Sequence, residues 1–150
     1  MDSKPPMPFP PPVLALLLML ITRLLGVGAP KLSGSLWRIL GYLFVAAGVG
    51  LGVSGFSWFK LKRTPVRPGE RPTQLVTDGV FQFTRNPMYL GTVIFLIGWA
   101  FLRRTPIALV AGPLFYAIID RWQIPFEESL LTEHFGNEFQ EYCAKVRRWL

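Results

Sequence analysis

Four stretches of apolar residues divide this chain, and polar segments separate them. They cover about residues 13–29, 36–59, 88–102 and 106–124. The second and fourth are long enough to cross a bilayer as helices, whereas the first and third need a thin bilayer or extended ends. Only Arg103, Arg104 and Thr105 separate the last two, which favours a helical hairpin. The pattern predicts an all-α polytopic membrane protein with about four transmembrane helices.

The segment before the first apolar stretch is a proline-rich leader over residues 1–12, expected to be extended. Val27, Gly28 and Ala29 resemble the small-residue cleavage site of a signal peptide. Pro30 follows directly and hinders cleavage, so we expect the first span to be retained. Residues 13–150 then form a single domain.

Small residues within the spans indicate close helix packing. Gly48 and Gly52 have the spacing that lets two helix backbones approach. Gly91 and Gly98 share one face of the third span, and Ala108 and Gly112 share one face of the fourth. The simplest interpretation is that the third and fourth spans pack against each other through these faces.

Beyond the spans, Pro125 is expected to begin a new amphipathic helix, with Glu127 and Glu128 in its first turn. Its apolar stripe recurs every three or four residues. The stripe comprises Leu131, Phe135, Phe139, Tyr142, Val146 and Trp149. This C-terminal helix should lie on the membrane surface or on the helical bundle.

Charge gives the expected orientation. The chain is 51% hydrophobic, yet its net charge is +7. Most basic residues fall in the loop after the second span or beyond the fourth. The positive-inside rule then predicts a protein of a bacterial inner membrane, with both termini and the 60–86 loop in the cytoplasm. The basic side suits anionic lipid headgroups, and nucleic acid is not needed to explain it. Cys143 is the single cysteine and His134 the single histidine, so we expect no metal.

Polar chemistry gathers at this same end. Asn86 suits a helix N-cap and Pro87 the first helical position, and a helix start beside Arg85 can bind an anion. Before it, residues 74–81 hold two short apolar stretches around an Asp78-Gly79 turn, and we expect them to fold back on the helices. The cationic, amide, phenolic and carboxylate groups suit a zwitterionic ligand meeting a lipid-side substrate. An ordinary belt of interfacial charges is the alternative. The groups are Arg85, Asn86, Tyr89, Asp120, Arg121, Glu127 and Glu128.

Several motifs in order make the chain resemble the integral-membrane methyltransferases, which include isoprenylcysteine carboxyl methyltransferases and phospholipid methyltransferases. The resemblance covers about residues 60–150. It rests on Leu75-Val76-Thr77-Asp78-Gly79-Val80-Phe81, Arg85-Asn86-Pro87-Met88-Tyr89-Leu90-Gly91, Glu127-Glu128 with Leu131, Phe135-Gly136, Tyr142 and Arg148-Trp149.

The resemblance implies S-adenosylmethionine as methyl donor and a lipophilic or lipid-like acceptor. The donor site would occupy about residues 60–150. The implied donor-binding residues are Gln74, Leu75, Val76, Phe81, Arg85, Asn86, Pro87, Met88, Tyr89, Glu127 and Glu128. Carboxylates suit the ribose hydroxyls or amino group of the donor, and Arg85 or the helix start suits its carboxylate.

The acceptor side is less defined by the sequence. In the prenylcysteine branch an arginine just before the acidic pair helps to hold the substrate carboxylate. Gln123 stands at that position here, with Arg121 two residues away. Competing functions are a sterol-reductase-like enzyme that binds NADPH, a small transporter and a non-catalytic membrane scaffold. A transporter needs an acidic residue within a span, and the first three apolar stretches contain none.

Overall fold

The computed structural model describes residues 7–29, 33–64 and 73–150 of the chain. Half of the proline-rich leader and residues 65–72 of the long loop lie outside these ranges. All the regular secondary structure of the described part is helical, with no strand, as the sequence predicts. Its α-helices are α1 (Pro11–Leu25), α2 (Leu36–Leu61), α3 (Pro87–Arg103), α4 (Ala111–Ile118), α5 (Ile124–Phe135) and α6 (Asn137–Lys145).

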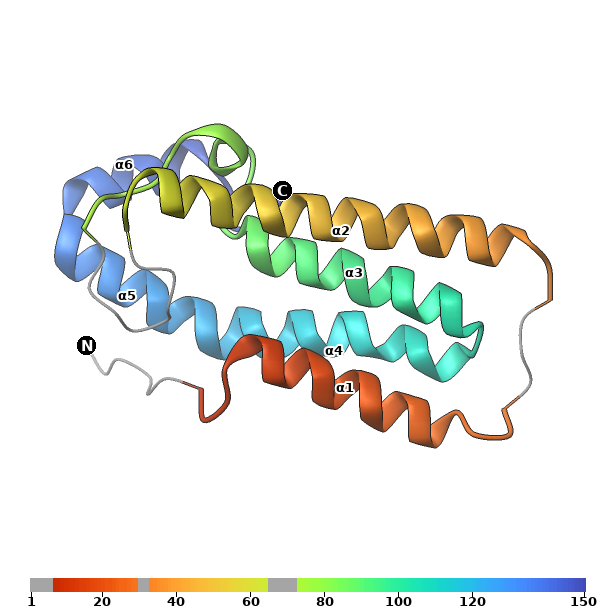
Figure 1. The fold of residues 1–150 in the computed structure, drawn as a ribbon. Coiled ribbons are helices and arrows are strands. Elements are labelled where there is room, and N and C mark those ends of the chain that lie inside the picture. Colours follow the sequence, from red (N-terminus) through yellow and green to blue (C-terminus); the bar gives the residue numbers. More distant parts are fainter. Residues whose placement is uncertain (1–6, 30–32, 65–72) are drawn as a thin grey trace.

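The helices form an elongated bundle in which α2 and α3 run in opposite directions, as do α3 and α4 (Figure 1). A short 3₁₀-helix, η2 (Pro106–Val110), leads into α4, and α5 and α6 lie at one end of the bundle. The fully buried centre consists of Leu96, Phe115, Ile119 and Ile124, with Leu18 of α1 packed against them. The first, third and fourth apolar stretches supply these residues, so burial and hydropathy agree there.

Glycines allow α2 and α3 to pack closely. A Cβ atom on Gly48 would lie 2.6 Å from the carbonyl oxygen of Gly91, and one on Gly98 would lie 2.6 Å from the backbone nitrogen of Val45. The expectation that Gly91 and Gly98 face the fourth span is therefore wrong, because the glycines of α2 occupy that face of α3. Gly112 does contact α3, through Ile97.

The helix expected to begin at Pro125 instead continues the fourth apolar stretch. A π-helical turn, η3 (Ile119–Gln123), joins α4 to α5, and Gln123 keeps helical dihedral angles (φ −70°, ψ −47°). Pro125 has no N–H to donate. The π turn before it already departs from the α bonding pattern, so the proline does not end the helix.

The predicted C-terminal helix is also shorter than expected. Gly136 has a φ of +50° and separates α5 from α6, and α6 ends at Lys145. Phe139 and Tyr142 of the apolar stripe are buried as expected. Val146 is extended rather than helical, so the last five residues turn back across the bundle instead of continuing the stripe.

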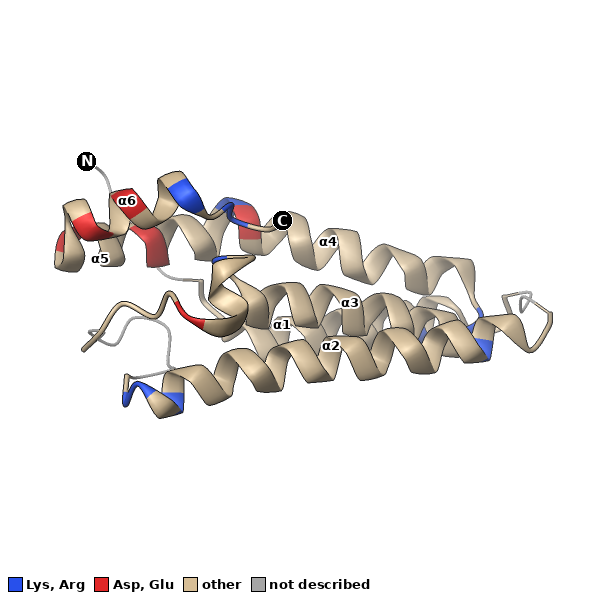
Figure 2. Ribbon diagram, turned by 90° about the horizontal axis from the view of Figure 1, so that it is seen from above, with Lys and Arg blue, Asp and Glu red and all other residues tan. Residues whose placement is uncertain are grey.

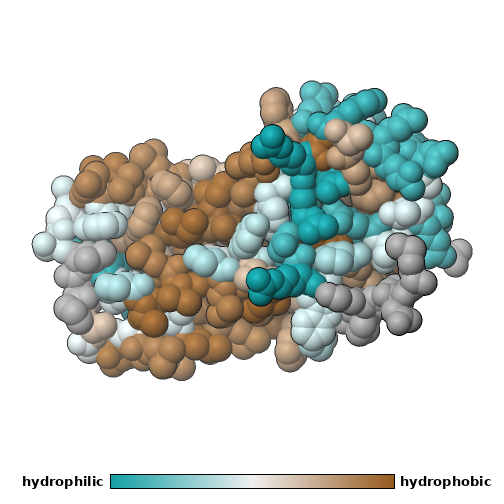
Figure 3. Space-filling view, turned by 180° about the vertical axis from the view of Figure 1, so that it is seen from behind, coloured by the Kyte–Doolittle hydropathy of each residue, from teal (hydrophilic) through white to brown (hydrophobic). Residues whose placement is uncertain are grey.

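Charged and apolar side chains occupy different regions along the length of the molecule. In the described part, lysine, arginine, aspartate and glutamate lie towards the two ends of the bundle (Figure 2). Between them the surface is brown with apolar side chains, and the polar end carrying α5 and α6 is teal (Figure 3). Exposed apolar residues of α2 include Leu43, Val53 and Phe56. A surface of this kind suits contact with lipid.

Two helical segments of the described part are long and apolar enough to cross a membrane. They are Leu36–Leu61 and the continuous segment Pro106–Phe135. Pro11–Leu25 and Pro87–Arg103 are apolar but shorter. The four-span topology therefore stays a prediction.

Candidate active site at the polar end of the bundle

The site begins where the polar loop enters α3. Asn86 occupies the N-cap position and Pro87 the first turn, as predicted, but the Asn86 side chain does not cap the helix. Its Nδ2 instead donates to the carbonyl oxygen of Arg148 at 3.0 Å. The amide therefore connects the start of α3 to the C-terminal segment, so its role comes from tertiary contact rather than from helix capping.

The loop before α3 folds back onto the helices as expected. Val76 and Phe81 are buried, and Phe81 packs edge-on against Phe59 of α2 with ring centroids 5.4 Å apart. Gly79 begins the 3₁₀-helix η1 (Gly79–Gln82) with a φ of +60°. The hydroxyl of Tyr142 donates to the Phe81 carbonyl at 2.6 Å, and burial raises the pKa of Tyr142, which keeps that donor protonated.

A cavity lies between this loop, the end of α2, α5 and α6. Its enclosed volume is about 80 Å³. Eight of the predicted donor residues line it, although they come from three separate stretches of sequence. The lining residues are Phe59, Gln74, Leu75, Val76, Phe81, Arg85, Asn86, Glu127, Glu128, Leu131, Phe139 and Tyr142. The fold thus brings together most of the residues that the resemblance implied.

Three of the predicted donor-binding residues, Pro87, Met88 and Tyr89, do not line the cavity. Pro87 and Met88 face α2, where a Cβ atom on Gly55 would lie 3.1 Å and 3.0 Å from them. Tyr89 lies behind the cavity wall and reaches Glu127. Arg121 is exposed on η3 and does not line the cavity, whereas Gln123 is fully buried.

Glu127 is held by two neutral donors. The Tyr89 hydroxyl donates to its Oε1 at 2.5 Å, and Gln123 Nε2 donates to the same oxygen at 2.8 Å. These three side chains come from α3, η3 and α5, so their contact fixes the relative positions of the three helices. Because both bonds within the described part end on Oε1, the carboxylate keeps acceptor capacity for a ligand in the cavity.

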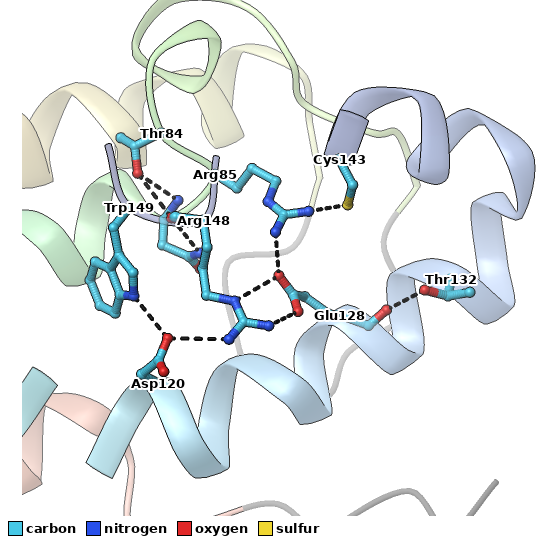
Figure 4. A network of polar contacts seen from close by, with 9 residues as sticks. Thr84, Arg85, Asp120, Glu128, Thr132, Cys143, Arg148 and Trp149 are labelled. Atoms are coloured by element: carbon cyan, nitrogen blue, oxygen red, sulfur yellow. Dashed lines mark hydrogen bonds and ion pairs between the residues drawn. The ribbon is translucent and has the colours of Figure 1, made fainter. Parts of the chain in front are cut away.

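Glu128 belongs to a separate ionic network (Figure 4). Arg85 Nη2 lies 3.0 Å from its Oε1, and Arg148 approaches both carboxylate oxygens. Arg148 also donates from Nη1 to Asp120 at 3.2 Å, and the Trp149 indole donates to Asp120 at 2.8 Å. Two arginines thus share two carboxylates, which distributes charge in a partly buried place.

Several residues that line or support the cavity were not predicted from the sequence as site residues. Phe59, Leu131, Phe139 and Tyr142 line the cavity, but none of them was predicted to bind the donor. All four were assigned to apolar spans or to the apolar stripe, and Leu131 and Tyr142 were also part of the motifs behind the family resemblance. Arg148 was identified only as part of a C-terminal motif. No local signal tells which carboxylate a distant arginine will contact.

The chemical types of the lining side chains fit a ligand like S-adenosylmethionine. Apolar and aromatic side chains form walls for a nucleoside, while carboxylates and an arginine supply opposite charges for an amino-acid tail. Within the described ranges, the buried Nε of Arg85 has no hydrogen-bond partner. The enclosed space is smaller than the several hundred Å³ of an ordinary ligand site. A more open cavity of about 510 Å³ adjoins it, and Glu128 and Phe139 line both.

The comparison with known families agrees with this arrangement. Residues 36–138 match the family model described as phospholipid methyltransferase. That match covers well over half of the chain, and the chain belongs to this family of membrane methyltransferases.

Named relatives point to the same class. A probable protein-S-isoprenylcysteine O-methyltransferase of Oryza sativa subsp. indica is 35% identical over 77 residues, which is 51% of this chain and 40% of that protein. The protein-S-isoprenylcysteine O-methyltransferase of Saccharomyces cerevisiae is 31% identical over 124 residues, 77% of this chain and 49% of that protein. An uncharacterized protein of Haemophilus influenzae is 36% identical over 63 residues, 42% of this chain and its own full length. The chain therefore spans about half or less of the named methyltransferases that it matches.

Proposed function

We propose that this protein transfers a methyl group from S-adenosylmethionine to a lipophilic acceptor at the cytoplasmic face of a membrane. One observation carries the proposal: residues implied by the family resemblance, six of them within residues 74–86 and the other two Glu127 and Glu128, line one cavity at the polar end of an apolar bundle. An ordinary belt of interfacial charges would not require them to converge.

Each group has a definite task in this proposal. Val76, Phe81 and Phe139 line the nucleoside part of the site and exclude water from it. Glu127 holds a hydroxyl or amino group of the donor, and Arg85 holds its carboxylate. The donor supplies a methyl group on a positively charged sulfur, which is already a good leaving group. The protein then has to align the two reactants, and alignment alone can supply about 7–11 kcal/mol of the barrier.

The acceptor enters from the apolar side. The relatives from rice and yeast are named for isoprenylcysteine, and the shared lipophilic character of such acceptors suits the exposed apolar surface next to the site. Gln123 does not extend towards a substrate carboxylate, because it is buried and bonded to Glu127. We therefore keep the acceptor class broad.

The topology belongs to the same proposal. Four spans with both termini and the 60–86 loop in the cytoplasm place the cavity, α5 and α6 on the side rich in basic residues. Residues 13–150 act as one domain, with the donor site in residues 60–150.

The test is binding of labelled S-adenosylmethionine and of NADPH to the purified protein in detergent. The expected result is saturable binding of the first and none of the second, and methyl transfer to long-chain acid, amine or thiol acceptors identifies the acceptor group. Binding of NADPH alone would support a reductase instead. If neither compound binds, the methyltransferase and reductase functions are both refuted, and a scaffold or a transporter remains as the function.

A further inference from the structure

The last five residues of the chain form a segment that crosses the start of α3. The backbone N–H of Arg85 donates to the Arg147 carbonyl at 3.1 Å, and the Thr84 hydroxyl donates to the Arg148 carbonyl at 3.2 Å. The Asn86 amide donates to the same Arg148 oxygen. Three consecutive residues before α3 therefore hold the backbone on either side of Arg148, and its side chain is directed at Glu128 and Asp120 (Figure 4).

Two nitrogens of the Arg148 guanidinium donate hydrogen bonds to the Glu128 carboxylate. Its Nε lies 3.2 Å from Oε1 and its Nη2 lies 2.5 Å from Oε2, while Nη1 reaches Asp120. This two-point contact is the geometry in which an arginine binds a carboxylate most strongly. It supplies Glu128 with a full positive charge that does not come from the cavity-lining Arg85.

Arg85 does not use all of its N–H donors on Glu128. It touches Glu128 only at Oε1, through Nη2, and its Nη1 contacts the Cys143 sulfur. Among the described residues, its Nε is buried and unpartnered. The Arg85 side chain is 14% exposed and lines the cavity, so an anionic group entering there would meet it.

We propose that Arg148 is a positioning residue: it neutralises Glu128 and so leaves Arg85 free to bind the carboxylate of the methyl donor. The inference rests on the proposed function and assigns to the C-terminal segment a part in donor recognition. Without Arg148, Glu128 has Arg85 as its remaining ionic partner in this network. The carboxylate then attracts a second nitrogen of Arg85, which turns the guanidinium away from the ligand.

The experiment compares S-adenosylmethionine with decarboxylated S-adenosylmethionine, which lacks only the carboxylate. Calorimetry on the full chain in detergent gives the affinity of each compound for the parent, Arg148→Ala, Arg148→Lys and Arg85→Ala. Lys145→Ala is the matched control, because it removes an exposed basic residue just before the same segment. The measured quantity is the ratio of the two affinities, and inactive protein in a sample does not alter it.

Arg148→Ala should weaken binding of the complete donor about tenfold, within the range found for residues that share one ionic network, and should change binding of the decarboxylated compound less than about twofold. Arg148→Lys should fall between, because it keeps the charge but loses the two-point contact. In an Arg85→Ala background, adding Arg148→Ala should have no further effect on the ratio.

An equal loss for both compounds would overturn the inference, since it would mean that Arg148 only supports the fold. An unchanged ratio in both Arg148 variants would overturn it as well. A parent protein that binds neither compound would instead refute the proposed function.

Discussion

Replacing Glu127 by glutamine tests the donor site most directly. The substitution keeps the size of the side chain and an acceptor oxygen for Tyr89 and Gln123, which lie 2.5 Å and 2.8 Å from Oε1. It removes the negative charge. If Glu127 contacts the donor, one charge-assisted hydrogen bond is lost, at about 1.5–3 kcal/mol, and donor affinity should fall about ten- to a hundredfold.

The structure also removes a competing explanation for this residue. A first-turn glutamate can stabilise a free helix N-terminus, but the helix runs through Gln123 and Ile124 without a break, so Glu127 faces no free N–H groups of that kind. Calorimetry gives the affinity, and thermal unfolding is recorded beside it. Glu133→Gln is the control on the exposed side of the same helix. A Glu127→Gln protein that binds donor like the parent would refute the role assigned to this carboxylate.

Three further predictions concern packing, topology and thiol chemistry. Gly48→Val should destabilise the contact of α2 with α3 by about 1–3 kcal/mol or more, seen as a lower melting temperature in detergent, because a Cβ there would lie 2.6 Å from backbone atoms of α3; an unchanged melting temperature would contradict the close contact. In a Cys143→Ser background, cysteines at Ser33 and Glu138 should react with an impermeant reagent from opposite sides of the membrane, and labelling from one side would exclude the four-span topology. Burial raises the pKa of the Cys143 thiol, so its alkylation near neutral pH should be slower than that of a free cysteine and should increase as the pH rises; a rate equal to that of free cysteine would contradict this.

Local signals in the sequence identified the helices well. The second apolar stretch ends within two residues of α2, and Pro87 begins α3 as its ring geometry requires. Hydrophobic stretches and proline positions act on the residues that carry them, which is why these boundaries follow from sequence. One mistake concerns Gly91 and Gly98, which face α2 and not the fourth span. The others lie at the C-terminal end, where Pro125 did not begin a new helix and Gly136 ended one.

By itself, the sequence determined that the described chain is helical, which segments are apolar, and which residues resemble a methyl-donor site. Only the tertiary structure decided how those residues are paired. Glu127 and Glu128 are neighbours, but side chains one residue apart on a helix point about 100° from each other. One therefore meets Tyr89 and Gln123, while the other meets Arg85 and Arg148. Those partners come from other helices and from the returning C-terminal segment. Packing between distant segments brings them together, and no local sequence pattern encodes that packing.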